Sequence, residues 1–287
     1  MKPLLAATLE DLSKLQFPVV VSPKLDGLRC IIRGGVALSR NLKPFRNAHV
    51  QRMLSTLPDC LDGELIVGEP NRGHVLNRTQ SGIMSTGGDP AFTFHMFDHF
   101  RSPLSPFVIR LNSLASIKHP VVKIVPHKVI TSLEELLEFE RATLLDGYEG
   151  IMVRKLDGKY KFGRSTLPEG ILSKFKRFSD GEAVVESLLE GVTNKNEATL
   201  DALGHTKRSH HQDSMEHSGQ VGTIVACEIK TGKQLFVSPG RMPFAMRKYY
   251  WENPHKLVGE TINIKWFGYG NLNAPRFCTF QSIRIPE

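Results

Sequence analysis

The sequence is poor in cysteine, and its four cysteines stand far apart without a C-x-x-C pair. This spacing supports neither a zinc ribbon nor a redox motif, and it does not resemble a disulfide framework. We interpret the four as buried free thiols in a reducing compartment. They are Cys30, Cys60, Cys227 and Cys278.

Long apolar runs are also lacking. No segment approaches the ~20 apolar residues of a membrane-spanning helix, and the apolar stretch at residues 4–7 is far shorter than the core of a signal peptide. We therefore expect a cytoplasmic protein, in the host cytoplasm if the source is viral, with no membrane partner. We also expect a monomer.

Acidic residues are fewer than basic ones, and this excess is uneven along the chain. The net charge is +8. Residues 1–178 hold 25 basic and 17 acidic side chains, whereas residues 179–287 hold 12 of each. A basic surface fits a polyanion such as nucleic acid, although it would also fit an acidic partner.

The first part of the chain has the pattern of sheets with flanking helices. Short apolar runs predict strands, and Gly34-Gly35 suits a hairpin turn between two of them. Apolar residues at helical spacing predict helices, the last with a Ser132-x-x-Glu135 capping box and Gly147 at its end. The predicted strands cover 19–21, 28–32 and 36–38, and the helices cover 50–57, 108–115 and 133–144.

After Phe178 the pattern becomes that of five strands with a helix at 243–251 between the third and the fourth, which predicts an OB-fold barrel. We expect residues 179–181 to be the linker and 191–219 to be a long loop between the first two barrel strands. The five strands are predicted at 183–189, 221–229, 234–237, 261–267 and 277–285.

The most informative segment lies between the first two predicted strands. It holds Lys24, Asp26, Gly27 and Arg29, and taken alone it could be a solvated Asp-Gly turn. The segment matches K-x-D-G-x-R, and it resembles the first motif of the covalent nucleotidyltransferases, which include ATP-dependent DNA ligases, RNA ligases and mRNA capping enzymes. Further boxes follow in order up to residue 284, and the chain is most similar to the small phage-type ATP-dependent DNA ligases.

The resemblance implies that Lys24 attacks the α-phosphorus of ATP and carries AMP, and it makes Asp26 of the same motif a catalytic residue. A lysine at its usual pKa of ~10.4 is protonated, so we expect burial and nearby cations to lower the pKa of Lys24. Lys174 and Lys176 match the fifth family motif and supply such cations as catalytic and nucleotide-binding residues. The alternative is a solvated basic edge.

Two glutamates match the family motifs that contact the metal ion and the nucleotide. Glu64 lies in an apolar strand, where an unpaired carboxylate is costly, and its segment resembles the third motif. Glu149 resembles the glutamate of the fourth motif, although it could also be a solvated residue at a helix end. The resemblance makes both of them nucleotide and metal ligands, and few carboxylates beside phosphates favour Mg²⁺.

Other family positions concern the base and the DNA. Phe97 matches the ring that stacks on adenine, although an aromatic residue in an apolar strand is usually core. Arg29 is expected to bind the nucleotide and to orient DNA, and Arg40 matches the arginine that holds the nick 5′-phosphate or is plain surface charge. The sixth motif offers Arg276 or Arg284 for the leaving pyrophosphate.

We therefore predict an α+β protein with two domains. Residues 1–178 would form an ATP-grasp-like nucleotidyltransferase domain of antiparallel sheets with flanking helices, and 179–287 an all-β OB-fold domain. The predicted function is ATP-dependent sealing of nicked duplex DNA through enzyme-adenylate and DNA-adenylate intermediates. Alternatives are an RNA ligase, an mRNA guanylyltransferase, or a noncatalytic OB-type DNA-binding protein. Further DNA contacts are expected from Lys195, Lys207 and Arg208.

Overall fold

The computed structural model describes residues 2–267, 275 and 277–284. The chain forms two compact units. Unit 1 consists of Met1–Lys176 with Ala202–Gly204, and unit 2 of Arg177–Asp201 with His205–Glu287. In the described part of the chain, no helix is long and apolar enough to cross a membrane.

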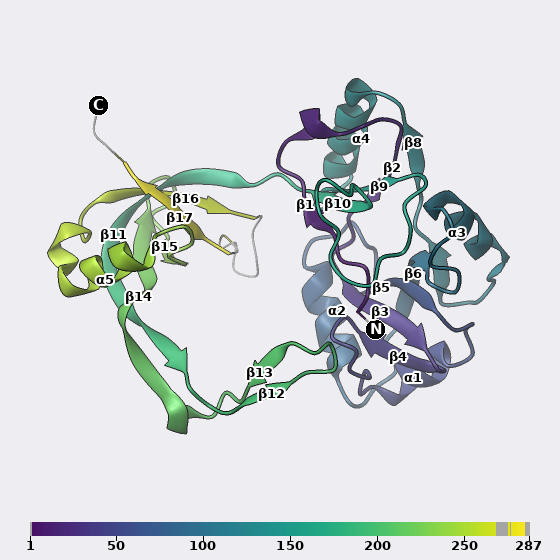
Figure 1. The fold of residues 1–287 in the computed structure, drawn as a ribbon, viewed down its shortest axis with the longest axis horizontal. Coiled ribbons are helices and arrows are strands. Elements are labelled where there is room, and N and C mark those ends of the chain that lie inside the picture. The colour runs from purple at the N-terminus through teal and green to yellow at the C-terminus, as the bar shows by residue number, and fades with distance from the viewer. Residues whose placement is uncertain (1, 268–274, 276, 285–287) are drawn as a thin grey trace. The chain divides into compact units, whose positions relative to one another are not determined.

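Unit 1 is built on two five-stranded sheets, which we call sheet I and sheet II (Figure 1). Each sheet is antiparallel except for one parallel pair at an edge, between the first two strands of sheet I and the last two of sheet II. Sheet I has the order β1 (Ala7–Thr8), β10 (Leu172–Phe175), β9 (Ile151–Lys155), β2 (Val19–Pro23), β8 (Lys128–Ile130). Sheet II has the order β4 (Val36–Ser39), β3 (Leu28–Arg33), β5 (Leu61–Val67), β6 (Phe92–His99), β7 (Val122–Ile124).

The helices of unit 1 cover the outer faces of these sheets. Leu136 of α4 belongs to the apolar core of sheet I, whereas Val50 of α1 and Ile83 of α2 belong to the core of sheet II. The helices are α1 (Ala48–Leu54), α2 (Val75–Met84), α3 (Phe107–Ser113) and α4 (Leu133–Leu145), with short 3-10 turns η1 (Leu12–Lys14) and η2 (Leu114–Ser116).

Apolar and polar side chains alternate along the strands of sheet II, so one face of the sheet is apolar and the other is polar. Leu61 and Leu65 of β5 point into the core, so Asp62 and Glu64 lie on the opposite face. A third cluster, which includes Leu4, Tyr160 and Leu172, joins that face to sheet I. Polar side chains of sheet II therefore lie on the face that turns toward sheet I.

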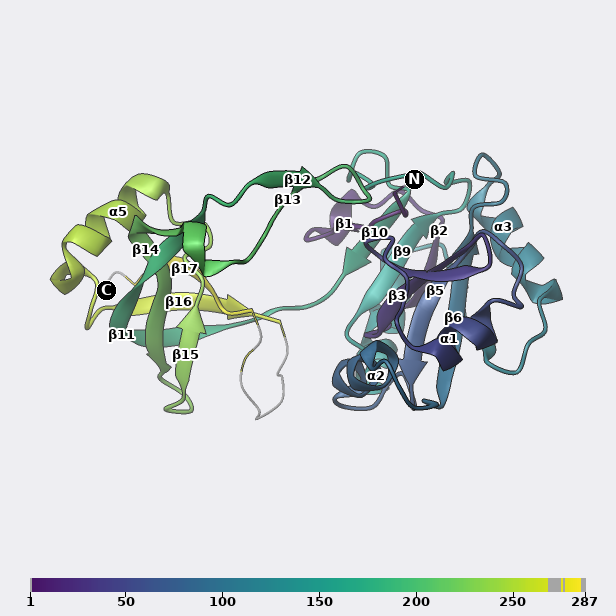
Figure 2. The same cartoon turned by 90° about the horizontal axis from the view of Figure 1, so that it is seen from below.

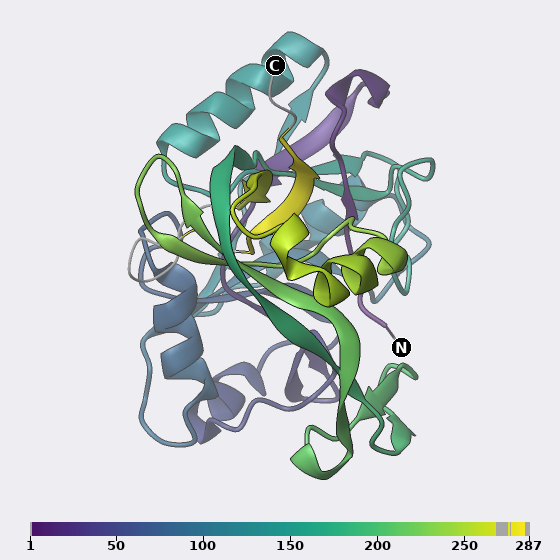
Figure 3. The same ribbon diagram turned by 90° about the vertical axis from the view of Figure 1, so that its left-hand side faces the viewer.

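Unit 2 is a five-stranded antiparallel sheet closed into a barrel. A parallel bridge between Ser238 and Thr279 joins the third strand to the fifth, and α5 (Phe244–Glu252) lies between the third and fourth strands in sequence (Figure 3). This is the topology predicted for an OB fold. The order is β15 (Gln234–Val237), β14 (Met215–Glu228), β11 (Ser179–Asn194), β16 (Thr261–Trp266), β17 (Thr279–Ile283).

The predicted loop at 191–219 is wrong in part. β11 runs on to Asn194 and β14 starts at Met215, and a small two-stranded hairpin lies between them (Figure 2). The hairpin consists of β12 (Ala198–Leu200) and β13 (Thr206–Arg208), and the 3-10 turns of unit 2 are η3 (Gln212–Ser214) and η4 (Pro254–Lys256). These two short strands are mostly polar and pair with each other, so no alternation of apolar residues in the sequence predicts them.

The predicted linker is also wrong. Residues 179–181 begin β11, where Ser179 pairs with Trp266, and Gly181 with Ile264. A glycine is required at 181 because a Cβ there would stand 2.9 Å from the Trp266 ring. The Ser-Asp-Gly composition is typical of a turn, but here it reflects close packing against an aromatic side chain.

Candidate active site

Lys24 is the first residue of the motif loop between β2 and β3, directly after the end of β2 in sheet I. The Lys24 backbone N–H donates to the Gly150 carbonyl at 2.8 Å. Gly150 has φ 154°, and a Cβ there would come within 2.4 Å of the Phe175 carbonyl oxygen. Gly27 is equally confined, because a Cβ would lie 2.3 Å from the Leu65 carbonyl oxygen of sheet II. Glycines thus let this loop fit closely between the two sheets.

Glu149 is the centre of the charged cluster. Its carboxylate accepts hydrogen bonds from the Lys24 ammonium group and, at 2.8 Å, from Lys176 Nζ. Burial opposes ionisation, but these two cations lower the pKa of Glu149 to about 2. The carboxylate is therefore ionised throughout the neutral range, and it fixes two lysine side chains from different segments.

Lys174 completes a group of three amines around this carboxylate. It lies in β10 and is half-buried. Burial lowers the pKa of Lys174, and the neighbouring charges of Lys176 and Lys24 lower it further. The structure thus brings Lys24, Lys174, Lys176 and Glu149 together, which gives a cationic surface able to receive phosphate oxygens.

Glu64 faces this cluster from β5 of sheet II. Burial raises the pKa of Glu64 to about 7, while the charges of Arg29 and Lys24 partly oppose that rise. The carboxyl therefore titrates near neutrality and lies within electrostatic reach of Lys24. Among the described residues no group of three or more histidine, cysteine, aspartate or glutamate side chains could hold a metal ion by itself.

Phe97 of β6 lies beside two guanidinium groups. The Arg29 Cζ atom is 4.7 Å from the ring centroid and the Arg154 Cζ atom is 5.6 Å from it. Arg29 in turn donates to Asp62 through Nε at 2.5 Å and Nη2 at 2.6 Å. The ring is partly exposed. The guanidinium groups of Arg29 and Arg154 hold it in place by cation–π contact, and its exposed part is accessible to a ligand.

The remaining predicted site residues come from the motif loop, from the turn after β4 and from unit 2. Asp26 is half-buried in the motif loop, and Arg40 is exposed in the turn after β4, where no hydrogen bond or ion pair ties its side chain to another described residue. Arg284 of unit 2 donates to Glu182 at 2.7 Å. Arg276 lies outside the described residues.

The three basic residues predicted for DNA are on the extension of the unit 2 barrel. Lys195 forms an ion pair with Glu216, and Arg208 donates to the Asn196 carbonyl. Lys207 is exposed in β13. All three sit on strands or their ends, whereas the sequence had placed them in a loop.

Sequence reasoning missed Tyr160. Its hydroxyl donates to Asp62 Oδ2 at 2.6 Å, so Asp62 is shared between Tyr160 and Arg29. Asp62 is fully buried. Tyr160 stands 98 residues away from Asp62 in a polar stretch without periodicity, and no local pattern could have revealed the pairing.

The two-sheet unit with its lysine–carboxylate cluster, followed by an OB-type barrel, defines the class of covalent nucleotidyltransferases. The model of the family described as "ATP dependent DNA ligase domain" matches residues 3–176. That match covers more than half of the chain, so the chain belongs to the ATP-dependent DNA ligase family. It is a ligase of the small type that uses ATP as adenylate donor and DNA as substrate.

Solved structures agree with this family. Two structures of Chlorella virus DNA ligase-adenylate are 32% and 33% identical to this chain, each with a TM-score of 0.57. The first covers 99% of both chains, and the second covers 100% of this chain and 99% of that one. A Lig E DNA ligase structure has a TM-score of 0.74 at 24% identity, over 99% of this chain and 100% of that one, and shows the fold alone. A comparison with curated proteins gave no match. The predicted fold class and function are confirmed.

Proposed function

We propose that this ligase seals nicks in duplex DNA by moving AMP from ATP to Lys24 and then to a DNA 5′-phosphate. The observation that carries the proposal is the Lys24–Glu149–Lys176 cluster between the two sheets of unit 1. The related Chlorella virus structures are ligase-adenylates, which supports a covalent AMP here. Residues 1–178 are then the adenylation domain, and 179–287 the OB-fold domain.

In the first step the amine of Lys24 forms a bond to the α-phosphorus of ATP, and the bond to pyrophosphate breaks. The amine must lose a proton to attack. Glu149 is a poor acceptor for that proton because its pKa is about 2. We therefore assign Glu149 to holding the amine in place. Lys174 and Lys176 offset charge on the phosphates.

The residues present fit a Mg²⁺ ion. Mg²⁺ keeps several waters and takes one or two carboxylates together with substrate phosphates, and Glu64 and Glu149 are two carboxylates that both interact with Lys24. When bound, the ion would neutralise charge on the phosphate oxygens. Glu64 would also contact the ribose, and Phe97, held from one side by Arg29, would stack on adenine.

Basic side chains would then hold the DNA and the leaving group. Arg40 is exposed and can receive the nick 5′-phosphate, and Arg29 would orient the DNA end beside it. Lys195, Lys207 and Arg208 would contact the duplex backbone. Arg276 or Arg284 would contact pyrophosphate. Arg284 would first have to break its ion pair with Glu182, which costs little free energy because both side chains are partly exposed to solvent. We propose a monomer with no membrane partner.

Labelling of the protein by ATP that is radioactive at the α-phosphate tests this assignment. Wild type should retain the label through denaturing electrophoresis, and Lys24→Ala and Lys24→Arg should not, because arginine keeps the charge but stays protonated. Lys14→Ala, a change at an exposed lysine, is the matched control and should label as wild type does. A labelled Lys24→Arg protein would refute the assignment. Labelling by GTP instead would indicate capping chemistry, and sealing of RNA ends alone an RNA ligase.

A further inference from the structure

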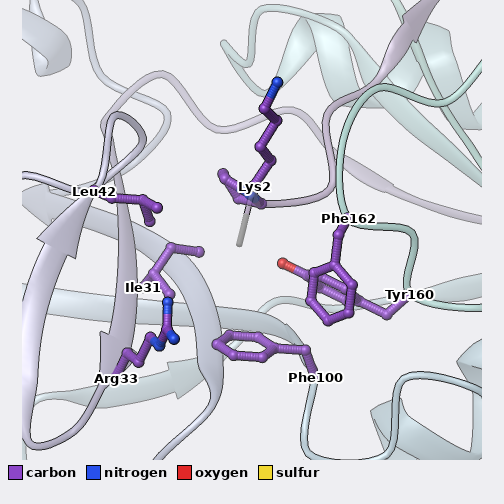
Figure 4. Close-up of a pocket in the computed structure, with 8 residues that line it drawn as sticks. Lys2, Ile31, Arg33, Leu42, Phe100, Tyr160 and Phe162 are labelled. Carbon is purple, nitrogen blue, oxygen red and sulfur yellow. The ribbon is translucent and has the colours of Figure 1, made fainter. Parts of the chain in front are cut away.

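A small hollow on unit 1 combines aromatic and basic side chains away from the lysine cluster (Figure 4). Figure 4 shows Phe100, Tyr160 and Phe162 on one side of it and Ile31, Leu42 and Arg33 on the other, with Lys2 above. The hollow is shallow and open to solvent, with an enclosed volume of about 10 Å³, roughly that of one water molecule. No acidic residue is among those that line it.

The floor of this hollow is rigid. Phe100 and Tyr160 belong to a buried apolar cluster that also contains Ile31. The Phe100 and Tyr160 ring centroids are 5.4 Å apart, as are those of Tyr160 and Phe162. Tyr160 is fixed further by its hydrogen bond to Asp62. A preformed floor of this kind requires no rearrangement when a ligand binds.

The rim carries the groups that a ligand would meet. Phe162 is 39% exposed, in contrast to 3% for Tyr160. Leu42 lies at φ 56°, a left-handed conformation that is uncommon for a residue other than glycine. This backbone at the turn after β4 presents Leu42 to the hollow, and such a conformation often marks a binding site. Lys2 and Arg33 add positive charge.

The hollow is too shallow to enclose a ligand, because pockets that enclose a small molecule hold ~300–1,000 Å³ and the enclosed space here is about 10 Å³. It can instead offer a surface against which one group of a longer ligand lies. Arg29, Ile31 and Arg33 alternate along one face of β3, at roughly 7 Å for each pair of residues. The hollow therefore lies along the strand from Arg29, and its Leu42 is two residues from Arg40.

We propose that this hollow binds a nucleotide of the nicked DNA strand next to the break, with the sugar or base against Phe162 and phosphates near Lys2 and Arg33. An exposed aromatic ring among cations is the usual surface for a nucleic acid strand. The proposal rests on the ligase function above, since it places the strand beside Arg40. It adds a second point of contact that fixes the strand's direction.

Binding of nicked duplex tests the proposal in a form that cannot be sealed, because the 3′ end lacks its hydroxyl. We expect Phe162→Ala and Lys2→Ala each to weaken binding about tenfold, which corresponds to ~1.4 kcal/mol. Phe162→Trp keeps a ring and should bind as wild type does. Leu145→Ala, at another exposed apolar residue of unit 1, and Lys14→Ala are matched controls that should leave binding unchanged.

The salt dependence of binding separates the phosphate contact of Lys2 from the stacking contact of Phe162. Lys2→Ala should reduce the slope of the logarithm of the association constant against the logarithm of the salt concentration by about one, because it removes a phosphate contact. Phe162→Ala should leave this slope unchanged. Labelling by ATP reports whether each variant retains its active site, and it is expected to stay at the wild-type level. Wild-type DNA binding by both alanine variants would overturn the proposal, as would parallel loss of labelling and binding. Neither outcome bears on the role proposed for Lys24, which is tested separately by labelling of Lys24→Ala and Lys24→Arg.

Discussion

At the scale of single residues, Glu149 has the largest influence on the lysine cluster. It is the one carboxylate to which both Lys24 and Lys176 donate within the described residues. Without it, Lys24 and Lys176 would lose the carboxylate to which both donate, and Glu64, whose charge also acts on Lys24, has a pKa of about 7. The position of the proposed nucleophile therefore depends on a carboxylate to which we assign no covalent step.

Glu149→Gln should lower the rate of labelling by ATP by about 100-fold, the cost of misplacing a reacting group by about 1 Å. The amide keeps the shape but loses the charge that orients both lysines. Glu138→Gln, at an exposed position of α4, is the control and should label normally. Single-turnover labelling at saturating ATP is the measurement; a rate within twofold of wild type would contradict this role.

Two buried histidines give a pH dependence to stability. Burial lowers the pKa of His127 to about 4, with the Arg154 charge adding to the effect, and burial lowers the pKa of His95 to about 4 as well. The usual histidine pKa is ~6.5. Between pH 6.5 and 4 these two histidines bind more protons in the unfolded chain than in the folded one, so they make the free energy of unfolding fall as the pH falls. Glu64, whose pKa is about 7 in the folded protein, acts in the opposite direction between about pH 4.5 and 7.

His127→Phe should flatten this profile. The His127 Nε2 atom is buried without a hydrogen-bond partner in the described structure, and the ring centroid is 5.5 Å from that of Phe107, so a phenylalanine ring preserves the packing. The change also removes the 2.7 Å hydrogen bond between His127 Nδ1 and the Val125 carbonyl, so the slope of stability against pH is compared rather than the stability at one pH. Urea unfolding at several pH values between 4 and 7 measures the slope. A variant as acid-sensitive as wild type would show that His127 does not contribute.

The sequence identified the residues of this cluster better than their partners. Lys24, Glu149 and Lys176 were found because their boxes occur in order along the chain, and the structure brings them into contact. The roles assigned to them stay predictions. Tyr160 was missed because pairing with Asp62 depends on tertiary structure and leaves no local spacing.

At the scale of elements, an ion cluster joins sheet I to sheet II. Asp98 of β6 accepts from Arg110 at 2.8 Å and from Arg154 of β9 at 2.8 Å. Asp98 and Arg110 are almost completely buried. This ion pair connects β6, which carries Phe97, to β9, which begins two residues after Glu149.

Asp98→Asn should destabilise unit 1 by about 3–5 kcal/mol, because it leaves two buried guanidinium groups without their counter-charge. Chemical unfolding measures the loss. Asp157→Asn is the control, since Asp157 is exposed and pairs with Lys155 at 3.4 Å, and it should change stability little. A change below 1 kcal/mol at Asp98 would contradict the inference.

Helices were predicted where their ends carried a signal. For α4, Ser132 accepts from the Glu135 N–H at 3.3 Å and Gly147 has φ 94°, as the capping pattern indicated. For α2, His74 precedes the helix with no side-chain cap. Its buried positions are Val75, Thr79 and Ile83, and a polar residue in the middle of that stripe hides the helical pattern.

At the scale of the whole molecule, the charge distribution governs affinity for DNA. The net charge of +8 lies within residues 1–178. Such a surface displaces counterions from the phosphate backbone. We expect affinity for nicked duplex to fall by about 10³-fold or more between 50 and 200 mM salt if at least six phosphates are contacted. Titrations at four salt concentrations check this, and an affinity independent of salt would contradict it.

The early start of β11 leaves a short segment between the last strand of unit 1 and the first strand of unit 2. β10 ends at Phe175 and β11 begins at Ser179, so three residues separate them. Lys176 is bonded to Glu149, and the Phe178 ring lies 3.5 Å from Lys265 Nζ of unit 2. Lys176 at one end of this segment is therefore anchored within unit 1, and Phe178 at the other end is anchored within unit 2. A substitution at Lys176 would then alter both the charge beside Glu149 and the first residue of the connection.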